Sequence, residues 1–127
     1  MPSNRQFLVA AGLAAAVLPA HAGDRSGAEV YAETCAACHA TGKDNAPKFG
    51  DAARWGKLNR EGLDDLVPAA MRGLRKMPPM GGNPQLGDLE LARAVVHMAN
   101  ASGGRFPEPS AADAERWRKR ADARKKR

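Results

Sequence analysis

The chain has 127 residues, a formal net charge of +6, two cysteines and three histidines. This length fits one small domain, and two cysteines cannot form a framework of several disulfides. Beyond the N-terminal segment, no stretch is long and apolar enough to cross a membrane.

Residues 1–22 are predicted to be a secretory signal peptide. Arg5 supplies a positive charge, the run FLVAAGLAAAVL is apolar but too short to span a bilayer, and the small residues Ala20 and Ala22 precede a cleavage site. The alternative is an uncleaved membrane anchor. We expect cleavage, which leaves a soluble periplasmic protein whose folded domain covers 23–105.

A helix is expected over 26–38, and it ends in the stretch ETCAACHATG. Both cysteines, Cys35 and Cys38, lie here, and His39 follows directly. A thiol redox pair is typical of a βαβ context, and a zinc site needs a second pair of ligands. The sequence shows neither of these features. C-x-x-C-H is typical of covalent haem attachment, in which each thiol forms a thioether with a haem vinyl group and the histidine binds the iron. We therefore predict one haem c, with His39 as the proximal iron ligand.

Farther along the chain, a loop over 74–87 carries two candidates for the second iron ligand. Its sequence RKMPPMGG has two prolines and two glycines, which make it stiff and non-helical. Such a loop can hold a methionine sulfur at a fixed distance from an iron, and Met77 is further restricted by the proline after it. The residues alone do not choose between Met77 and Met80. The other candidates in the mature chain are His97, Met71 and Met98.

The rest of the chain is predicted as helices and loops. The expected order is a loop at 40–50, helices near 51–57 and 62–73, the methionine loop 74–87, and a final helix from a cap at Asp88 to about Asn100. Pro68 is expected in the first turn of the middle helix. No alternating pattern marks a strand. The predicted fold class is therefore all-α, with short helices wrapped around a haem that completes the small core.

The order of these motifs resembles that of the class I monohaem cytochromes c, and most closely the bacterial cytochrome c5 group. The matching pieces are GAEVY, CAACH, GKDNAPKFGD, a tryptophan, MPPMGG and LGDLELARAVVHM. The resemblance implies that Met77, which precedes the proline, is the axial iron ligand. Met80 is the fallback for that role.

The resemblance also implies roles for residues around the haem. The Pro47 carbonyl would accept a hydrogen bond from the His39 imidazole, which fixes the ring and raises its basicity. Trp55 would lie near a haem propionate, to which its N–H can donate. Gly27 would let the first helix approach the last one closely, and His97 is interpreted as a residue of that helix interface rather than as an iron ligand.

Residues 106–127 are predicted to be a proline-containing linker, FPEPS, and a basic C-terminal tail. Residues 113–127 hold eight basic and three acidic side chains, whereas the two kinds balance across 23–112. Ser110 is expected to cap a short helix. The tail is interpreted either as a solvated, frayed extension or as a docking element for an acidic redox partner or an anionic membrane surface. Nucleic acid is not expected as a partner of an exported protein.

These features predict a periplasmic one-electron carrier rather than an enzyme, because no acid–base pair or nucleophile constellation accompanies the haem motif. The expected partners are redox proteins of a respiratory chain or dehydrogenases. The alternative is a haem-bearing electron-transfer subunit of an exported dehydrogenase or reductase complex. Two other hypotheses stay open: a gas-binding haem protein, which requires a vacant sixth iron position, and a thiol oxidoreductase without haem.

Overall fold

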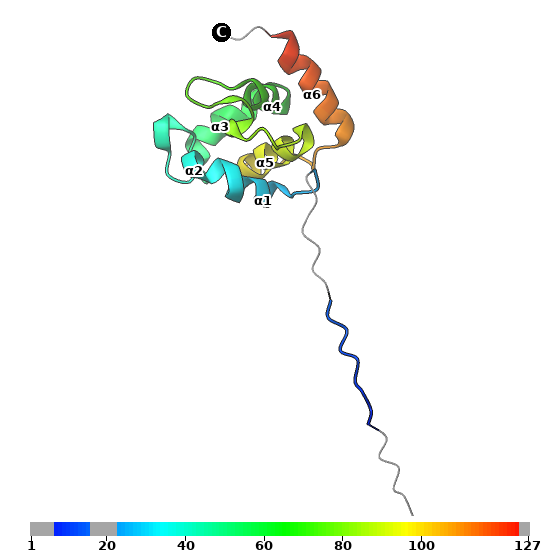
Figure 1. Cartoon of the computed structure of the whole chain (residues 1–127). Helices are drawn as coiled ribbons and strands as arrows, with labels where there is room; N and C mark the ends of the chain where they lie inside the picture. The colour runs from blue at the N-terminus through cyan, green and yellow to red at the C-terminus, as the bar shows by residue number, and fades with distance from the viewer. Residues whose placement is uncertain (1–6, 16–22, 125–127) are drawn as a thin grey trace, which may run out of the picture.

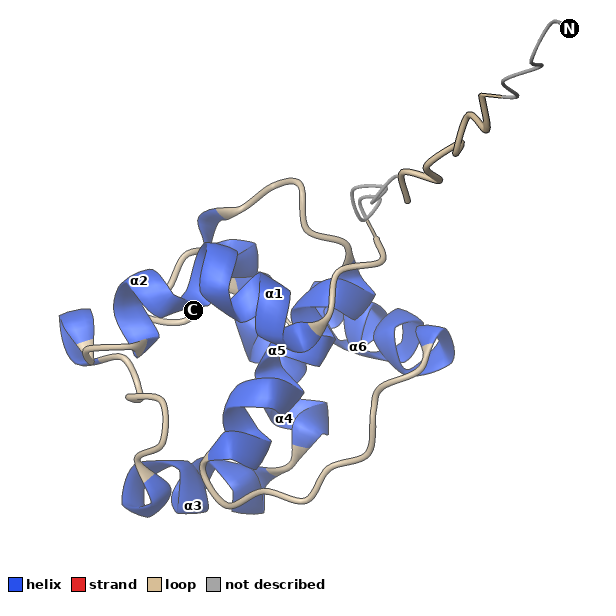
Figure 2. Ribbon diagram, turned by 90° about the horizontal axis from the view of Figure 1, so that it is seen from below, coloured by secondary structure: helices blue, strands red, loops and turns tan. Residues whose placement is uncertain are grey.

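The computed structural model describes residues 7–15 and 23–124, and the regular structure in these ranges is helical. No strand occurs among the described residues, and the only pairing of that kind there is a single bridge between Leu74 and Met77. Figures 1 and 2 show short helices joined by long loops. The predicted all-α fold class is confirmed for this part of the chain.

The first helical run carries the cysteine motif. It consists of α1 (Gly27–Val30), the π-helical turn η1 (Tyr31–Cys35) and α2 (Ala36–His39), which follow one another without a break. The Ser26 hydroxyl accepts a hydrogen bond from the Glu29 N–H at 3.1 Å, and the Glu29 carboxylate accepts one from the Ser26 N–H at 2.9 Å. These reciprocal bonds satisfy two amide groups that the helix itself leaves without partners. The helix predicted at 26–38 is confirmed, shifted by one residue.

Two helices follow the loop after the motif. Their bounds, with those of the turn before them, are η2 (Lys43–Asn45), α3 (Ala52–Glu61) and α4 (Leu63–Arg72). Gly62 separates α3 from α4 with a φ of 82°, a conformation that favours glycine. The helix predicted near 62–73 is confirmed, but the placement of Pro68 in its first turn is wrong, because α4 begins at Leu63 and Pro68 lies buried inside it. Asp64 and Asp65 in the first turn stabilise the start at Leu63, since carboxylates favour a helix N-terminus.

The methionine loop leads into α5 (Asp88–Ala101) through the 3-10 turn η3 (Pro79–Gly82). The predicted last helix is confirmed, but its capping residue is not Asp88. Gly87 is the N-cap residue, and the Glu90 carboxylate accepts a hydrogen bond from its N–H at 3.0 Å. The Asp88 carboxylate instead pairs with Arg118, at 2.7 Å.

The close contact between α1 and α5 depends on Gly27. A Cβ atom at this position would collide with the backbone carbonyl of Arg93, so a larger residue does not fit. Beside this contact, the ring of Tyr31 lies 4.6 Å from that of Phe49 and 5.6 Å from that of His97, centroid to centroid. The close approach at Gly27 and the interface role of His97 are therefore confirmed.

The basic tail forms a helix, α6 (Ala111–Ala123), that packs against α4 and α5 (Figure 1). As expected, Ser110 caps it, with the hydroxyl accepting from the Asp113 N–H at 3.1 Å. Trp117 is only 3% exposed, and its indole N–H donates to Asp64 Oδ1 at 2.7 Å. The interpretation of the tail as a frayed extension is wrong for 111–123.

Of the predicted signal peptide, only residues 7–15 lie in the described part of the chain. They form no helix, and the apolar side chains of Phe7, Leu8 and Leu13 are exposed. Arg5 and the cleavage site lie outside the described residues. Within 7–15 and 23–124, no helix has the length and apolar character that a membrane span requires.

Candidate haem site

The helical run places the three motif residues on one helix face. Cys35 and Cys38 are three positions apart, and His39 lies four positions from Cys35, which are the spacings that align side chains on a helix. Cys35 is buried, Cys38 is partly exposed, and neither forms a disulfide. His39 is only 8% exposed. Two thiols and one imidazole therefore share one face of the run.

The backbone of the following loop holds the His39 ring. His39 Nδ1 lies 2.8 Å from the carbonyl oxygen of Pro47, so the ring nitrogen donates to that oxygen. A neutral imidazole that donates from Nδ1 keeps its lone pair on Nε2. The hydrogen bond expected between these two residues is present, and it leaves Nε2 available to a metal.

Trp55 lies in α3 close to the same ring. It is buried, and its ring centroid is 6.5 Å from that of His39. The indole N–H donates to the backbone carbonyl of Lys48 at 3.1 Å, so its hydrogen bond fastens α3 to the loop that contains Pro47. The position of Trp55 near a haem propionate stays a prediction.

The two methionines of the loop have different surroundings. Met77 packs partly buried against the hydrophobic core, and its backbone exchanges two hydrogen bonds with Leu74, at 2.9 and 3.0 Å. Met80 has a φ of 56°, and its sulfur lies 3.3 Å from Nη2 of Arg118. The Met80 sulfur therefore accepts a hydrogen bond from a cation.

The methionine loop is attached to the helical run of the motif. Asn83 Nδ2 donates to Thr34 Oγ1 at 3.0 Å, directly beside Cys35 in the chain. A second, exposed link joins Lys76 to Asp44 at 3.6 Å, between the residue before Met77 and the turn η2. The loop and the motif are thus held next to each other although they are far apart in the sequence.

This set of donors fits haem c. Two unpaired thiols at the C-x-x-C spacing can form thioethers, and the imidazole beside them has its Nε2 free to bind iron. Burial raises the pKa of the Cys35 thiol to about 11, whereas catalytic thiols have a lowered pKa, which argues against a thiol oxidoreductase. In the part of the chain that the structure describes, no group of three or more His, Cys, Asp or Glu side chains is suited to hold a metal ion.

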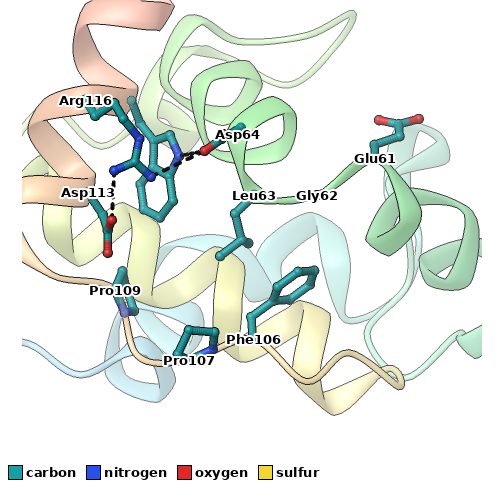
Figure 3. Close-up of a pocket in the computed structure, with 10 residues that line it drawn as sticks. Glu61, Gly62, Leu63, Asp64, Phe106, Pro107, Pro109, Asp113 and Arg116 are labelled. Atoms are coloured by element: carbon teal, nitrogen blue, oxygen red, sulfur yellow. Dashed lines mark hydrogen bonds and ion pairs between the residues drawn. The ribbon is translucent and has the colours of Figure 1, made fainter.

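A separate pocket of about 370 Å³ lies between α6, the segment before it and the α3–α4 junction (Figure 3). Phe106, Pro107 and Leu63 form its apolar side, and Asp64 and Arg116 lie at its polar side. Neither a histidine nor a cysteine lines it. This pocket therefore lies at the interface between α6 and the rest of the domain, and it is not part of the haem site.

Short helices around a C-x-x-C-H motif, a histidine held by a proline carbonyl and a methionine-bearing loop define a c-type haem protein. Comparison with known proteins agrees: the family described as "Cytochrome C oxidase, cbb3-type, subunit III" matches residues 22–98. Cytochrome c5 from Azotobacter vinelandii is 45% identical over 80 residues, which are 61% of this chain and 95% of that relative. The chain belongs to this cytochrome family, among the class I monohaem cytochromes c of the c5 group.

Other relatives agree with this assignment. Cytochrome c-555 from Chlorobaculum thiosulfatiphilum is 37% identical over 81 residues, which are 61% of this chain and 94% of the relative. A solved chain from the "Crystal structure of electron transfer complex of nitrite reductase with cytochrome c" matches with a TM-score of 0.59 and 37% identity, over 62% of this chain and 96% of that one. The protein therefore carries covalently bound haem c with iron, and it is an electron-transfer protein rather than an enzyme.

Sequence reasoning missed the contacts that α6 makes with the site. The family match ends at residue 98, before α6 begins at Ala111. The buried face of α6 consists of Ala114, Trp117 and Ala121, three and four positions apart. This helical spacing was the available signal, but two alanines contribute little hydrophobicity, so the face is easily overlooked among basic residues.

Proposed function

We propose that this cytochrome is a periplasmic one-electron carrier whose iron is held between His39 and Met77. The observation that carries the proposal is the hydrogen bond from His39 Nδ1 to the Pro47 carbonyl, 2.8 Å long. Such a bond fixes the orientation of a ligating imidazole and raises its basicity. Cys35 and Cys38, on the same helix face, would hold the haem covalently and prevent its loss outside the cell.

The surroundings of the two loop methionines favour Met77 as the second ligand. The Met80 sulfur is already engaged by the Arg118 guanidinium, 3.3 Å away. The backbone N–H and C=O of Met77 both form hydrogen bonds with Leu74, and the proline that follows restricts the Met77 backbone further. A ligand on a stiff backbone can occupy one position with little loss of conformational entropy.

His/Met ligation suits a carrier. When bound, haem c supplies an iron that changes its oxidation state by one electron, and a methionine ligand raises the reduction potential relative to two histidines. The chain contributes stiffness: Pro47 holds the imidazole, and the Leu74–Met77 pairing holds the segment that carries the second ligand. Little rearrangement is then needed when an electron enters or leaves.

We further propose that redox partners dock on the surface around the methionine loop. Leu74 is 56% exposed, and the exposed Arg75 follows it directly. An apolar contact beside a positive charge favours an acidic redox protein. The cytochrome c chain with a similar fold comes from a complex with nitrite reductase, which supports a protein partner of this kind.

The basic tail is less suited to that docking role. Its arginines Arg116, Arg118, Arg120 and Arg124 each pair with an aspartate of the same chain, at 2.7 to 3.5 Å. We therefore assign the described part of the tail to the fold rather than to an acidic partner or a membrane surface. If the protein is instead a permanent subunit of an exported dehydrogenase or reductase, it will copurify with the larger enzyme.

Periplasmic location follows from the predicted signal peptide and from haem attachment, which suits an exported protein. N-terminal sequencing of the protein from the periplasmic fraction should begin at Gly23. A chain that still starts at Met1 and stays with the membrane fraction would support the anchor alternative.

The first test of the ligation is the optical spectrum of the exported haem protein, recorded ferric and ferrous with and without carbon monoxide. We expect a low-spin, six-coordinate spectrum with a weak iron–methionine band and no response to carbon monoxide. A high-spin or carbon monoxide-binding protein would overturn the carrier proposal and point to a gas-binding site. A colourless protein would contradict the presence of haem.

A pair of variants then separates the two methionines. Met77→Leu should abolish the iron–methionine band and open the sixth position to carbon monoxide. Met80→Leu should keep the band. The reverse result would identify Met80 as the second iron ligand.

A further inference from the structure

One arginine of α6 reaches both the middle and the end of the methionine loop. Nε and Nη2 of Arg118 donate to the two carboxylate oxygens of Asp88, at 3.0 and 2.7 Å. Nη2 also lies 3.3 Å from the sulfur of Met80. Asp88 begins α5 where the loop ends, and Met80 lies midway along the loop. A single planar guanidinium therefore links two points of the segment that follows Met77.

The helix that carries this arginine is itself firmly placed. Trp117, the neighbour of Arg118, is 3% exposed and donates to Asp64 of α4 at 2.7 Å. Arg120 pairs with Asp65 of α4 at 3.1 Å. α6 thus has anchors on α4 that are independent of the methionine loop, and Arg118 extends from this fixed base. A bidentate pair between arginine and a carboxylate adds geometric restraint as well as energy.

The loop needs such restraint more than the helices do. Its regular structure is limited to the Leu74–Met77 bridge and η3, and Met80 holds a left-handed backbone with a φ of 56°. Loops with few buried contacts open more readily than packed helices. Each brief opening of this loop would draw Met77 away from the iron.

We propose that Arg118 is a positioning residue that keeps the methionine loop closed and thereby keeps Met77 on the iron. The proposal rests on the His39/Met77 ligation proposed above. It assigns to α6, which lies beyond the family match at residues 22–98, a part in holding the axial ligand. Asp88 and the Met80 sulfur are the two points that Arg118 holds.

The loop opening can be measured through an added ligand. Imidazole binds the ferric iron only when the methionine has left it, so its apparent affinity is proportional to the fraction of open loop. Weakening the hold on the loop therefore tightens apparent imidazole binding without any change in the iron site itself.

The experiment titrates imidazole into the ferric holoprotein and compares Arg118→Gln with Lys119→Gln. Both variants remove one positive charge from α6, but Lys119 is exposed and pairs with Glu115 of the same helix. We expect about fivefold tighter imidazole binding in Arg118→Gln, in line with the strength of a partly exposed bidentate pair, and no change in Lys119→Gln. Equal affinities in the two variants overturn the proposal.

A second variant keeps the test decisive if Arg118→Gln folds poorly. Asp88→Asn should also tighten imidazole binding. The double variant should bind imidazole no more tightly than Arg118→Gln alone, because both changes remove the same Arg118–Asp88 interaction. Fully additive effects would contradict the proposal. A wild-type protein that is high-spin would overturn both the ligation and the role of Arg118, whereas a low-spin wild type with an unchanged Arg118→Gln would overturn the role of Arg118 alone.

Discussion

The two sides of the haem site are built in different ways. On the histidine side, His39 belongs to the same helical run as both cysteines, and its ring is held by a backbone carbonyl of Pro47. On the methionine side, the candidate ligand lies in a loop whose position depends on side chains from other elements, among them Thr34 and Arg118. The first side is fixed by local sequence, and the second is fixed by contacts between distant segments.

This difference predicts different consequences of mutation. Changes on the histidine side should affect haem retention and folding, because the haem completes a small core. Changes on the methionine side should affect the equilibrium between bound and released ligand, and should leave the thioethers and His39 in place. The predictions below test this contrast.

The largest effect is expected from His39→Ala. Without the proximal imidazole, the haem loses its ligand on the helix that also carries the thiols, so we expect little or no low-spin holoprotein in the periplasm. Met77→Leu serves as the matched change on the other side and should accumulate with haem attached. Absorbance of the haem relative to total protein measures both, and equal yields would contradict the contrast.

The next largest effect, on the free energy of unfolding, is expected at the contact between α1 and α5. Gly27→Ala places a Cβ atom against the Arg93 carbonyl, so α1 must move away from α5 and the free energy of unfolding should fall by about 1–3 kcal/mol. Gly56→Ala in α3 is the control, because its Cβ atom would meet nothing closer than the end of the Arg60 side chain, at 3.9 Å. This change should be neutral or stabilising by up to about 1 kcal/mol. Thermal unfolding of the two holoproteins compares them.

Much of the histidine side could be predicted from the sequence, because its determinants lie within a short stretch. The helix, Cys35, Cys38 and His39 are adjacent, and the bond to Pro47 spans only eight positions. The contacts of Arg118 join residues thirty or more positions apart, and no local pattern indicates them. The placement of Pro68 was wrong for a different reason: a proline is typical of a first turn, but Gly62 is the N-cap of α4 and Asp64 and Asp65 occupy its first turn.

A partly buried ion pair near the end of the methionine loop predicts a pH effect. The Arg25 guanidinium, whose Nε lies 2.6 Å from Glu90, is the main cause that lowers the pKa of this carboxyl to about 2, from 4.5. Since the folded protein holds this group ionised, its contribution to stability is present above about pH 5 and is lost as the pH falls toward 2.

Glu90→Gln should therefore lower the free energy of unfolding by about 2 kcal/mol at pH 7 and by much less at pH 3. Glu115→Gln is the control, because it removes only an exposed pair with Lys119 and should cost less than about 0.5 kcal/mol. Urea unfolding at both pH values gives the comparison. A Glu90→Gln cost that is the same at pH 7 and pH 3 would show that the Arg25 pair does not stabilise the fold in this way.

The smallest effect is expected where the two sides meet. Thr34 lies on the helical run beside Cys35, but its hydroxyl accepts from Asn83 of the methionine loop at 3.0 Å. Thr34→Val keeps the shape of the side chain and removes this bond, which is worth about 1 kcal/mol. If the contrast holds, the loss appears as a few-fold tighter binding of imidazole to the ferric protein, with haem yield unchanged, because only the loop has been loosened. Thr41→Val, at an exposed position after the motif, should change neither quantity. A loss of haem in Thr34→Val would mean that the contact supports the motif helix as much as the loop, and the two sides would then act as one unit.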